Sequence, residues 1–280
     1  MNIGIIGNGF VGKATGLLNN SNVNLLVYDV DETKCIPINT TLLDISKCDL
    51  VFICVPTPMN KGKDCNISIV ESIVEKLKGL NDKVLIVIRS TVIPGTSDKL
   101  NVYFMPEFLT EAKWSEDFYN TEHWIFGRPK NHDKLFDINI TNLFSLSKKE
   151  NKIKNDNIHF VENKEAEMLK YFKNVYLALK VSFANEMYDY CCKKEIDYDI
   201  VKDLVKLDSR ITGSHLNVPG PDGKRGYGGT CFPKDTNALA VDMEKNKVNS
   251  IILNSIIKRN ETIDRPEKEW MSNIGRTVTE

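Results

Sequence analysis

The first residues of the chain constrain its fold more than any other segment. An apolar run over residues 2–6, NIGII, leads directly into GNGFVG at residues 7–12, and a helix-compatible segment follows. In this arrangement Gly7 makes the tight turn, Gly9 leaves room for a pyrophosphate to approach the backbone, and Gly12 lets the helix pack on the strand. The phosphates would lie at the helix N-terminus. The order of strand, glycine turn and helix therefore predicts a dinucleotide-binding domain.

An acidic residue after the next apolar run indicates which dinucleotide binds. The run LLVY at residues 25–28 ends at Asp29, about 20 residues beyond the turn, where an acid accepts hydrogen bonds from the adenosine ribose. A carboxylate there would repel a 2′-phosphate, so we expect NAD rather than NADP. The residues expected to contact the cofactor are Gly7, Gly9, Phe10, Val11, Gly12, Asp29, Lys34, Val55, Pro56, Thr57, Thr91 and Lys234.

Apolar runs alternate with helical patterns through the first half of the chain. Runs at residues 51–55, 84–88 and 102–104 follow the first two, and an amphipathic segment covers residues 67–77. This alternation predicts an α/β fold with a doubly wound, mostly parallel Rossmann-type sheet. Polar or turn-forming residues follow three of these runs, at the strand ends where such sheets bind ligands. We expect an NAD-binding domain over residues 1–153 and a helical domain over residues 154–280.

A long helix is predicted from residue 163. Apolar residues spaced three and four apart predict a core stripe along it. Lys170 and Asn174 lie on a neighbouring stripe, one turn apart, and either point together at a cleft or form a solvated edge. Further helical patterns cover residues 237–245 and 250–260, before a short charged tail. The core stripe comprises Leu169, Phe172, Tyr176, Leu179, Phe183, Met187 and Tyr190.

One cysteine lies in a glycine-rich turn near the end of the chain. The segment GYGGTCFPKD at residues 226–235 places Lys234 and Asp235 just beyond Cys231. Glycines allow close approach of a substrate, and a nearby cation or helix N-terminus lowers the pKa of a thiol. The segment therefore suits a nucleophilic thiolate, although a buried, inert cysteine beside a turn is the alternative.

Composition excludes several other classes of protein. With 280 residues, 41% of them hydrophobic, and a formal net charge of −1, the chain can bury a large core and offers no electrostatic case for nucleic acid or anionic membrane. No apolar stretch approaches the span of a bilayer, and the N-terminus has no basic segment typical of a signal peptide. Seven cysteines without CxxC spacing predict neither a disulfide framework nor a metal site, and favour a cytoplasmic location.

With these segments in place, the chain resembles the UDP-glucose/GDP-mannose dehydrogenase family as far as about residue 265. Five strings carry the resemblance in the family's order: GNGFVG, STVIPG, PEFLTE, EAEMLKYFKN and GYGGTCFPKD. The resemblance implies an NAD-binding domain followed by a helical domain that forms a homodimer. It also implies oxidation of the C6 alcohol of a nucleotide sugar, most simply UDP-glucose, to a carboxylate, with two NAD reduced in succession.

The resemblance also assigns catalytic roles. The family's nucleophile falls on Cys231, its active-site lysine and asparagine on Lys170 and Asn174, and its helper aspartate on Asp235. A Cys231 thiolate would trap the aldehyde as a thiohemiacetal, and a second oxidation would give a thioester that water opens. Lys170 and Asn174 would stabilise the oxyanion. Asp235 would assist proton transfer.

The acidic string PEFLTE supplies further candidates. Glu107 would position and activate the hydrolytic water together with Thr91. Glu111 lies one helical turn beyond Glu107 if the segment is helical, and is either part of the site or a solvated carboxylate. Arg210 would suit a phosphate, and His215 is expected to be a loop residue near the substrate rather than a base. The full set expected to contact substrate is Phe108, Leu109, Glu111, Lys170, Asn174, Arg210, His215, Tyr227 and Gly228.

The chain departs from the family in ending at residue 280, where relatives continue into a third, nucleotide-binding domain. A separate polypeptide could supply that domain, the enzyme could act with fewer contacts, or the chain could be a fragment. Two rival functions stay open. One is a two-electron dehydrogenase of a small hydroxy acid, for which Cys231 would be superfluous. The other is a non-catalytic NAD-binding subunit that presents a dimer surface to a partner.

Overall fold

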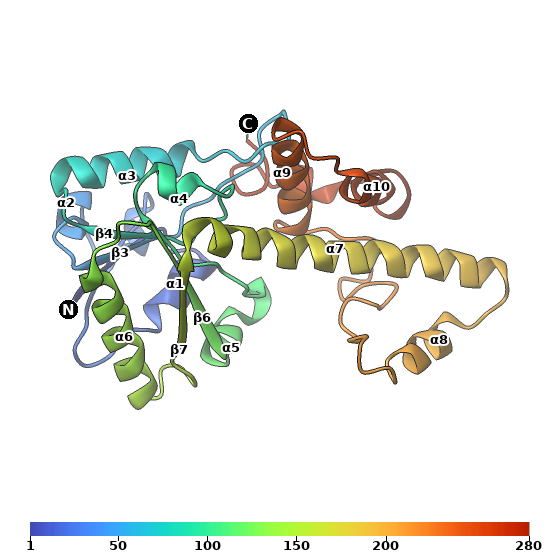
Figure 1. Ribbon diagram of the computed structural model, residues 1–280, viewed down its shortest axis with the longest axis horizontal. Helices are drawn as coiled ribbons and strands as arrows, with labels where there is room; N and C mark the ends of the chain where they lie inside the picture. The colour runs from blue at the N-terminus through green and yellow to red at the C-terminus, as the bar shows by residue number, and fades with distance from the viewer. Residues whose placement is uncertain (280) are drawn as a thin grey trace. The chain divides into compact units, whose positions relative to one another are not determined.

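The structure, a computed structural model, describes residues 1–279 and divides them into two compact units (Figure 1). The first unit contains Met1–Thr57 and Asn66–Lys170, and the second contains Pro58–Cys65 and the chain from Tyr171 onward. The last strand of the sheet covers residues 157–162 in the first unit, whereas the boundary expected near residue 153 leaves that strand to the second domain. No helix within residues 1–279 is both long and apolar enough to cross a membrane.

The first unit is built on one seven-stranded sheet in the order β2-β1-β3-β4-β5-β6-β7. Neighbouring strands are parallel except β5 and β6, which are antiparallel. This confirms the doubly wound, mostly parallel α/β fold expected from the sequence. The strands are β1 (Asn2–Ile6), β2 (Asn24–Tyr28), β3 (Leu50–Ile53), β4 (Leu85–Ile88), β5 (Tyr103–Phe104), β6 (His123–Arg128) and β7 (Asn157–Glu162).

Helices cover both faces of this sheet, which explains why its central strands are apolar throughout. Phe52 and Val87 point to one face, where they join residues of α1 (Phe10–Gly16), α5 (Trp114–Tyr119) and α6 (Lys134–Lys149). Val51 and Ile86 point to the other face, toward α2 (Leu42–Ile45), α3 (Ser68–Leu80) and the start of α7 (Asn163–Lys193). The short helix α4 (Thr96–Lys99) follows β4. The carboxyl ends of β1 to β4 are thereby fixed as an edge from which loops emerge.

The second unit is helical. It contains most of α7 with α8 (Tyr198–Val205), α9 (Phe232–Lys245) and α10 (Ile251–Arg259), and a π-helical turn at Asn260–Asp264. The end of the chain is packed rather than a free charged tail: Trp270 is 1% exposed. The amide of Met59 donates to the carbonyl of Thr277 at 2.7 Å, and the amide of Thr279 donates back to the carbonyl of Met59 at 2.9 Å.

The expected core stripe on the long helix is wrong. Phe172 is 63% exposed and Phe183 is 58% exposed, whereas Lys170 and Asn174 are buried. The apolar spacing correctly predicted a helix but not which side faces the protein. The side of the helix that carries Lys170 and Asn174 is the packed side. Lys170 pairs with Glu107, and Asn174 donates to Asp235, inside the fold.

Candidate functional site

The glycine turn at the end of β1 has the geometry that a dinucleotide requires. Gly7 has a φ of +91°, which a glycine adopts without strain. A Cβ atom on Gly12 would lie 2.0 Å from the carbonyl oxygen of Gly7, so helix and turn pack as closely as the motif predicts. A Cβ on Gly9 would meet nothing within 4 Å, which leaves open space at the N-cap of α1. The turn therefore fits the pyrophosphate of NAD.

Asp29 follows β2 beside this turn. Its Oδ2 accepts a hydrogen bond from the amide of Asn8 at 2.7 Å, and its Oδ1 accepts one from the amide of Asp31 at 3.0 Å. These bonds fix the carboxylate next to the turn, and the second lone pair of each oxygen suits a ribose hydroxyl. Lys34 lies nearby on the surface, where its ammonium pairs with Asp31 at 2.9 Å. The acid and turn together fit an adenosine ribose without a 2′-phosphate.

The remaining cofactor candidates of the first unit lie at strand ends. Val55 and Pro56 follow β3, and the Thr57 hydroxyl donates to the carbonyl oxygen of Thr91, beyond β4, at 2.8 Å. The loops after β3 and β4 are thereby tied together. Their contact with a cofactor stays a prediction, as it does for Phe10 and Val11 in the first turn of α1.

A buried lysine and carboxylate form the second feature of the first unit. The Lys170 ammonium lies 3.0 Å from Glu107 Oε2 and also donates to the Glu107 carbonyl oxygen. Both side chains are buried, Lys170 at 4% exposure. The Phe108 ring lies 5.7 Å from the same ammonium, and the amide of Leu109 donates to the Glu107 carboxylate. The PEFLTE segment and α7 thus hold a cation and an anion in one fixed pair.

Glu111 lies four residues beyond Glu107 in the same segment. Glu107 lies outside any helix, and Glu111 begins a short 3-10 helix (Glu111–Lys113) as an exposed residue. The two glutamates are therefore not one helical turn apart. A role for Glu111 in the site stays a prediction.

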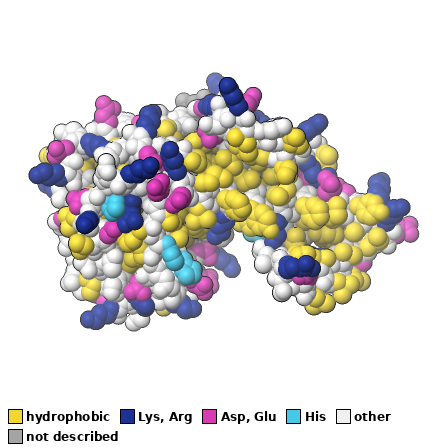
Figure 2. All heavy atoms as spheres, in the orientation of Figure 1, with side chains coloured by type: hydrophobic (Ala, Val, Ile, Leu, Met, Phe, Trp, Pro, Cys, Tyr) yellow, Lys and Arg dark blue, Asp and Glu magenta, His cyan; other side chains and the backbone are white. Residues whose placement is uncertain are grey.

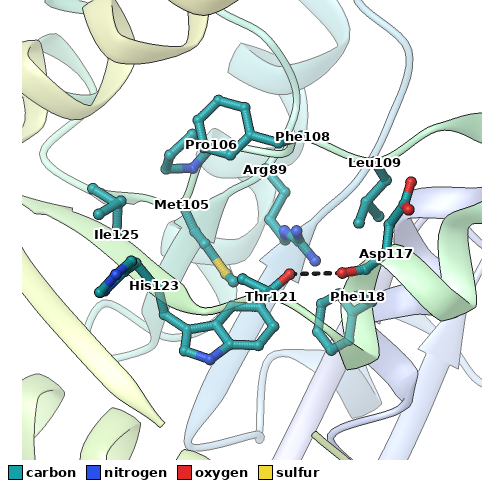
Figure 3. Close-up of a pocket in the computed structure, with 11 residues that line it drawn as sticks. Arg89, Met105, Pro106, Phe108, Leu109, Asp117, Phe118, Thr121, His123 and Ile125 are labelled. Atoms are coloured by element: carbon teal, nitrogen blue, oxygen red, sulfur yellow. Dashed lines mark hydrogen bonds between the residues drawn. The ribbon is translucent and has the colours of Figure 1, made fainter. Parts of the chain in front are cut away.

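A small cavity of about 50 Å³ in the first unit is lined by Arg89, which was not among the site residues predicted from the sequence (Figure 3). Arg89 is 3% exposed, and its guanidinium lies 5.6 Å from the centre of the Phe118 ring. It donates to the Thr15 hydroxyl, and burial lowers its pKa. The Thr121 hydroxyl donates across the cavity wall to the carbonyl of Asp117 at 2.9 Å. The signal for Arg89 was a single charge directly after the apolar strand β4.

The cysteine of the glycine-rich turn lies at the start of a helix in the second unit. Cys231 is the N-cap residue of α9 and is half-buried. The positive end of a helix favours the anionic form of a thiol. This position is compatible with a nucleophile, and the role of Cys231 as one stays a prediction.

A buried polar triad lies one turn further along α9. Asp235 is fully buried, and its Oδ1 lies 2.9 Å from the Lys234 ammonium. Its Oδ2 accepts from the side-chain amide of Asn174, on α7, at 2.6 Å. Burial alone would lower the pKa of Lys234, but the negative charges of Asp235, Cys65 and Cys231 outweigh it and raise the pKa. The lysine therefore stays protonated and partnered. The structure thus brings Asn174, Lys234 and Asp235 together.

A larger cavity of about 410 Å³ lies within the second unit. His215, Tyr227 and Gly228 line it, three of the residues expected to contact substrate. Burial and the nearby Lys180 lower the pKa of His215, which favours the neutral ring. A substrate contact by His215 stays a prediction.

The arginine of this cavity differs from the one expected. Arg265 lines the cavity, whereas the Arg210 side chain is 86% exposed and pairs with Asp208. A substrate contact by Arg210 stays a prediction. Nothing local in the sequence marks Arg265, which follows the last helical pattern in a stretch that reads as a charged tail.

These features define a class. A doubly wound sheet, a glycine turn fitted to a dinucleotide and an acid fixed beside that turn are those of an NAD-dependent dehydrogenase.

The chain belongs to the UDP-glucose/GDP-mannose dehydrogenase family. The family's NAD-binding domain matches residues 39–146, and its central domain matches residues 164–262. The first of these family domains is an NAD-binding domain, so the expected cofactor is confirmed.

Named relatives agree with this assignment. The chain is 31% identical to a UDP-glucose 6-dehydrogenase of Rickettsia typhi over 93% of its own length and 67% of the relative. It is also 31% identical to one of Campylobacter jejuni, over 93% of its own length and 72% of the relative. The solved UDP-glucose dehydrogenase of Pyrobaculum islandicum superposes with a TM-score of 0.79 at 25% identity, over 93% of this chain and 68% of that one. The chain thus spans about two thirds of the length of these relatives.

Proposed function

We propose that the protein oxidises the C6 alcohol of a nucleotide sugar, most simply UDP-glucose, to the uronate in two successive NAD-dependent steps. The observation that carries the proposal is Cys231 at the N-cap of α9, with Asn174, Lys234 and Asp235 buried in the same unit. An alcohol-to-aldehyde dehydrogenase has no use for a nucleophile, whereas a second oxidation to the acid does. Relatives named as UDP-glucose 6-dehydrogenases support this substrate.

NAD held at the glycine turn and Asp29 would supply the hydride acceptor for each oxidation, and the side chains do the rest of the chemistry. The Cys231 thiolate attacks the aldehyde carbon, forming a C–S bond, and the carbonyl oxygen becomes the oxyanion of a thiohemiacetal. Loss of the second hydride leaves a thioester. Attack by water breaks the C–S bond, releases the carboxylate and regenerates the thiolate.

Two donors on α7 are assigned to the developing oxyanion. Lys170 and Asn174 lie one turn apart on this helix, so their side chains project from the same side. The Asn174 amide uses one N–H on Asp235 and retains a second for a ligand. Fixed donors of this kind stabilise an oxyanion without reorganising, an effect of about 3 kcal/mol for a single donor.

The remaining roles concern water and protons. Glu107, held by Lys170, is assigned with Thr91 to orient and activate the hydrolytic water. Asp235 is assigned to proton transfer. Lys234 and Asn174 each contact one oxygen of its carboxylate and so fix its orientation.

The decisive experiment measures NADH formation by the protein with UDP-glucose, GDP-mannose and UDP-N-acetylhexosamines. Two NADH per sugar oxidised are expected with one of them. Cys231→Ala should abolish the carboxylate product, and the matched control Cys192→Ala, at an exposed cysteine, should retain it. One NADH per sugar with full activity in Cys231→Ala would instead establish a two-electron dehydrogenase.

We also propose a homodimer formed through α7. Phe172, Tyr176 and Phe183 are each more than half exposed on this helix, and Figure 2 shows apolar side chains gathered along it. Sedimentation at micromolar concentration should give a dimer that Phe183→Glu converts to a monomer. A wild-type monomer would contradict the proposal.

Two further proposals accompany this function. A cytoplasmic location is supported by an odd number of cysteines without disulfide spacing. A separate chain carrying a nucleotide-binding domain is proposed as a partner if the protein binds NAD without turnover. Adding such a domain in trans should then restore NADH formation, and failure to restore it would favour a non-catalytic subunit.

A further inference from the structure

The larger cavity of the second unit contains a buried guanidinium held by the chain's own carboxylates. Arg265 is 3% exposed. Its Nη2 lies 2.6 Å from Asp222 Oδ2 and 2.7 Å from Glu269 Oε1, and its Nε donates to Glu269 Oε2 at 2.8 Å. Among the described residues that line this cavity, Arg265 is the one arginine. Two carboxylates therefore surround one fixed cation at the cavity wall.

The Glu269 carboxylate also lies against the glycine loop that leads to Cys231. A Cβ on Gly228 would lie 2.2 Å from Glu269 Oε1 and 2.4 Å from Arg265 Cζ, so both charged groups touch the backbone there. The Gly229 amide points to the same carboxylate at 3.5 Å. A guanidinium beside backbone amides of a turn with positive φ is an arrangement that binds phosphate oxygens. The carboxylate of Glu269 stands where such an anion would bind.

The cation is fixed and the carboxylates are exchangeable. The Arg265 side chain is 4% exposed, against 32% for Glu269 and 48% for Asp222. Glu269 holds the guanidinium through two charge-assisted contacts, the same donors that a phosphate would use, but a diphosphate brings more negative charge to them than one carboxylate does. A diphosphate entering the cavity can therefore displace Glu269.

Glu269 is held beside Arg265 because the segment that carries it is packed within the second unit. Glu269 begins a 3-10 helix (Glu269–Ser272), and the next residue, Trp270, is 1% exposed. The hydrogen bonds of Met59 with Thr277 and with Thr279 hold the same segment further on. These residues follow the part matched by the family's central domain, which ends at residue 262.

We propose that Arg265 binds a phosphate of the nucleotide-sugar substrate and that Glu269 occupies the same position until the substrate displaces it. The inference rests on the proposed function for the identity of the ligand. Arg265 then determines affinity for the diphosphate, and Glu269 lowers that affinity by competing for the guanidinium. A sugar without its diphosphate would not displace Glu269 from Arg265.

The test measures binding without turnover. Calorimetric titration with UDP and with inorganic pyrophosphate, at constant ionic strength, compares the wild type with Glu269→Gln and Arg265→Met. Glu269→Gln should tighten binding by about threefold, because the amide competes less well for the guanidinium. Arg265→Met should weaken binding by about tenfold or more, and Arg265→Lys should restore part of it. The matched control is Glu267→Gln, on the same segment, whose carboxylate pairs with exposed Lys224.

The outcomes are distinct from those of the activity assay. Equal pyrophosphate affinity in Glu269→Gln and Glu267→Gln overturns the inference, even if NADH forms at the normal rate. Tighter binding in Glu269→Gln alone supports it, even if no nucleotide sugar is oxidised. If Arg265→Met fails to fold, the comparison of the two glutamate variants still decides.

Discussion

The molecule has two glycine-rich turns, and they use glycine for opposite purposes. In the first, a Cβ on Gly9 would meet nothing within 4 Å, so the missing side chain leaves space that a ligand can fill. In the second, a Cβ on Gly228 would lie 2.2 Å from Glu269, so the missing side chain makes room for the protein itself. A glycine motif therefore does not reveal, by itself, what approaches its backbone.

The two turns also differ in what holds them. The first is held by the strand before it, the helix after it and the end of the adjacent strand β2, where Tyr28 accepts from the amide of Gly7 and Asp29 accepts from the amide of Asn8. The second is fixed from a distance: Asn260 accepts from the amide of Tyr227 at 2.8 Å and donates to its carbonyl at 2.9 Å. Substitutions in the two turns should therefore affect different properties.

Gly12→Ala should have the largest effect. The new Cβ would lie 2.0 Å from the Gly7 carbonyl oxygen, and backbone cannot move aside as a side chain can. We expect a loss of about 3 kcal/mol in the free energy of unfolding, measured by urea denaturation. Gly16→Ala is the control, since its nearest neighbour would be 3.7 Å away, and it should be neutral or stabilising. Equal stability of the two variants would contradict close packing at the first turn.

Gly226→Ala tests the second turn. Gly226 has a φ of +66°, and a Cβ would lie 2.4 Å from Asn260 Oδ1. We expect a loss of about 2 kcal/mol from strain and displacement of Asn260, with turnover reduced more than NAD affinity. Gly223→Ala has a φ of +73° but open space around its Cβ, so it should show the strain alone, about 1 kcal/mol. If the two variants lose the same stability, the Asn260 contact is unimportant.

Gly9→Ala should leave the fold intact and weaken the binding of NAD. Because nothing lies within 4 Å of the new Cβ, the unfolding midpoint should not change. NAD affinity should fall about tenfold, since the methyl group occupies the approach of the pyrophosphate. Fluorescence titration with NADH measures this, with Gly79→Ala in α3 as a control that also has open space. Unchanged affinity would mean that the cofactor does not approach this turn.

The sequence predicted those parts of the fold that local pattern determines. The apolar strands β1 to β4 and helices α3, α9 and α10 lie where the periodicity indicated. The edge strand β7 alternates exposed and half-buried residues, so it lacks the apolar run that marked the others. The orientation of α7 was missed because Lys170 and Asn174 are buried through partners distant in the chain. Periodicity cannot show such partners.

The candidate site divides in the same way. The glycine turn, Asp29 and Cys231 could be predicted because strand ends and helix starts place them. Arg265 could not, because its position depends on the fold of the chain after α10 and on Glu269. A hydrogen bond or ion pair between distant segments leaves no trace in local composition.

The smallest effect concerns a third turn, at Gly95, which has a φ of +99°. The Glu167 carboxylate accepts from the Gly95 amide and, at 2.8 Å, from the Ser97 amide, which fixes the start of α4. Burial raises the pKa of Glu167 despite these hydrogen bonds. A carboxyl whose pKa is raised by folding contributes stability that is present below its unfolded pKa and is lost as pH rises through the folded value.

Glu167→Gln removes this titration and one of the two acceptors. Urea denaturation from pH 4 to pH 8 should therefore show the variant less stable by about 1 kcal/mol at the acidic end, with the difference shrinking as pH rises. Glu165→Gln, an exposed neighbour on α7, is the control and should follow the wild type at every pH. A difference that grows with pH would mean that the folded protein prefers the ionised carboxylate. The hydrogen bonds from the turn would then have a larger effect on the pKa of Glu167 than burial has. The third turn would be held by an ionised carboxylate, as the second is held by Glu269 and Arg265.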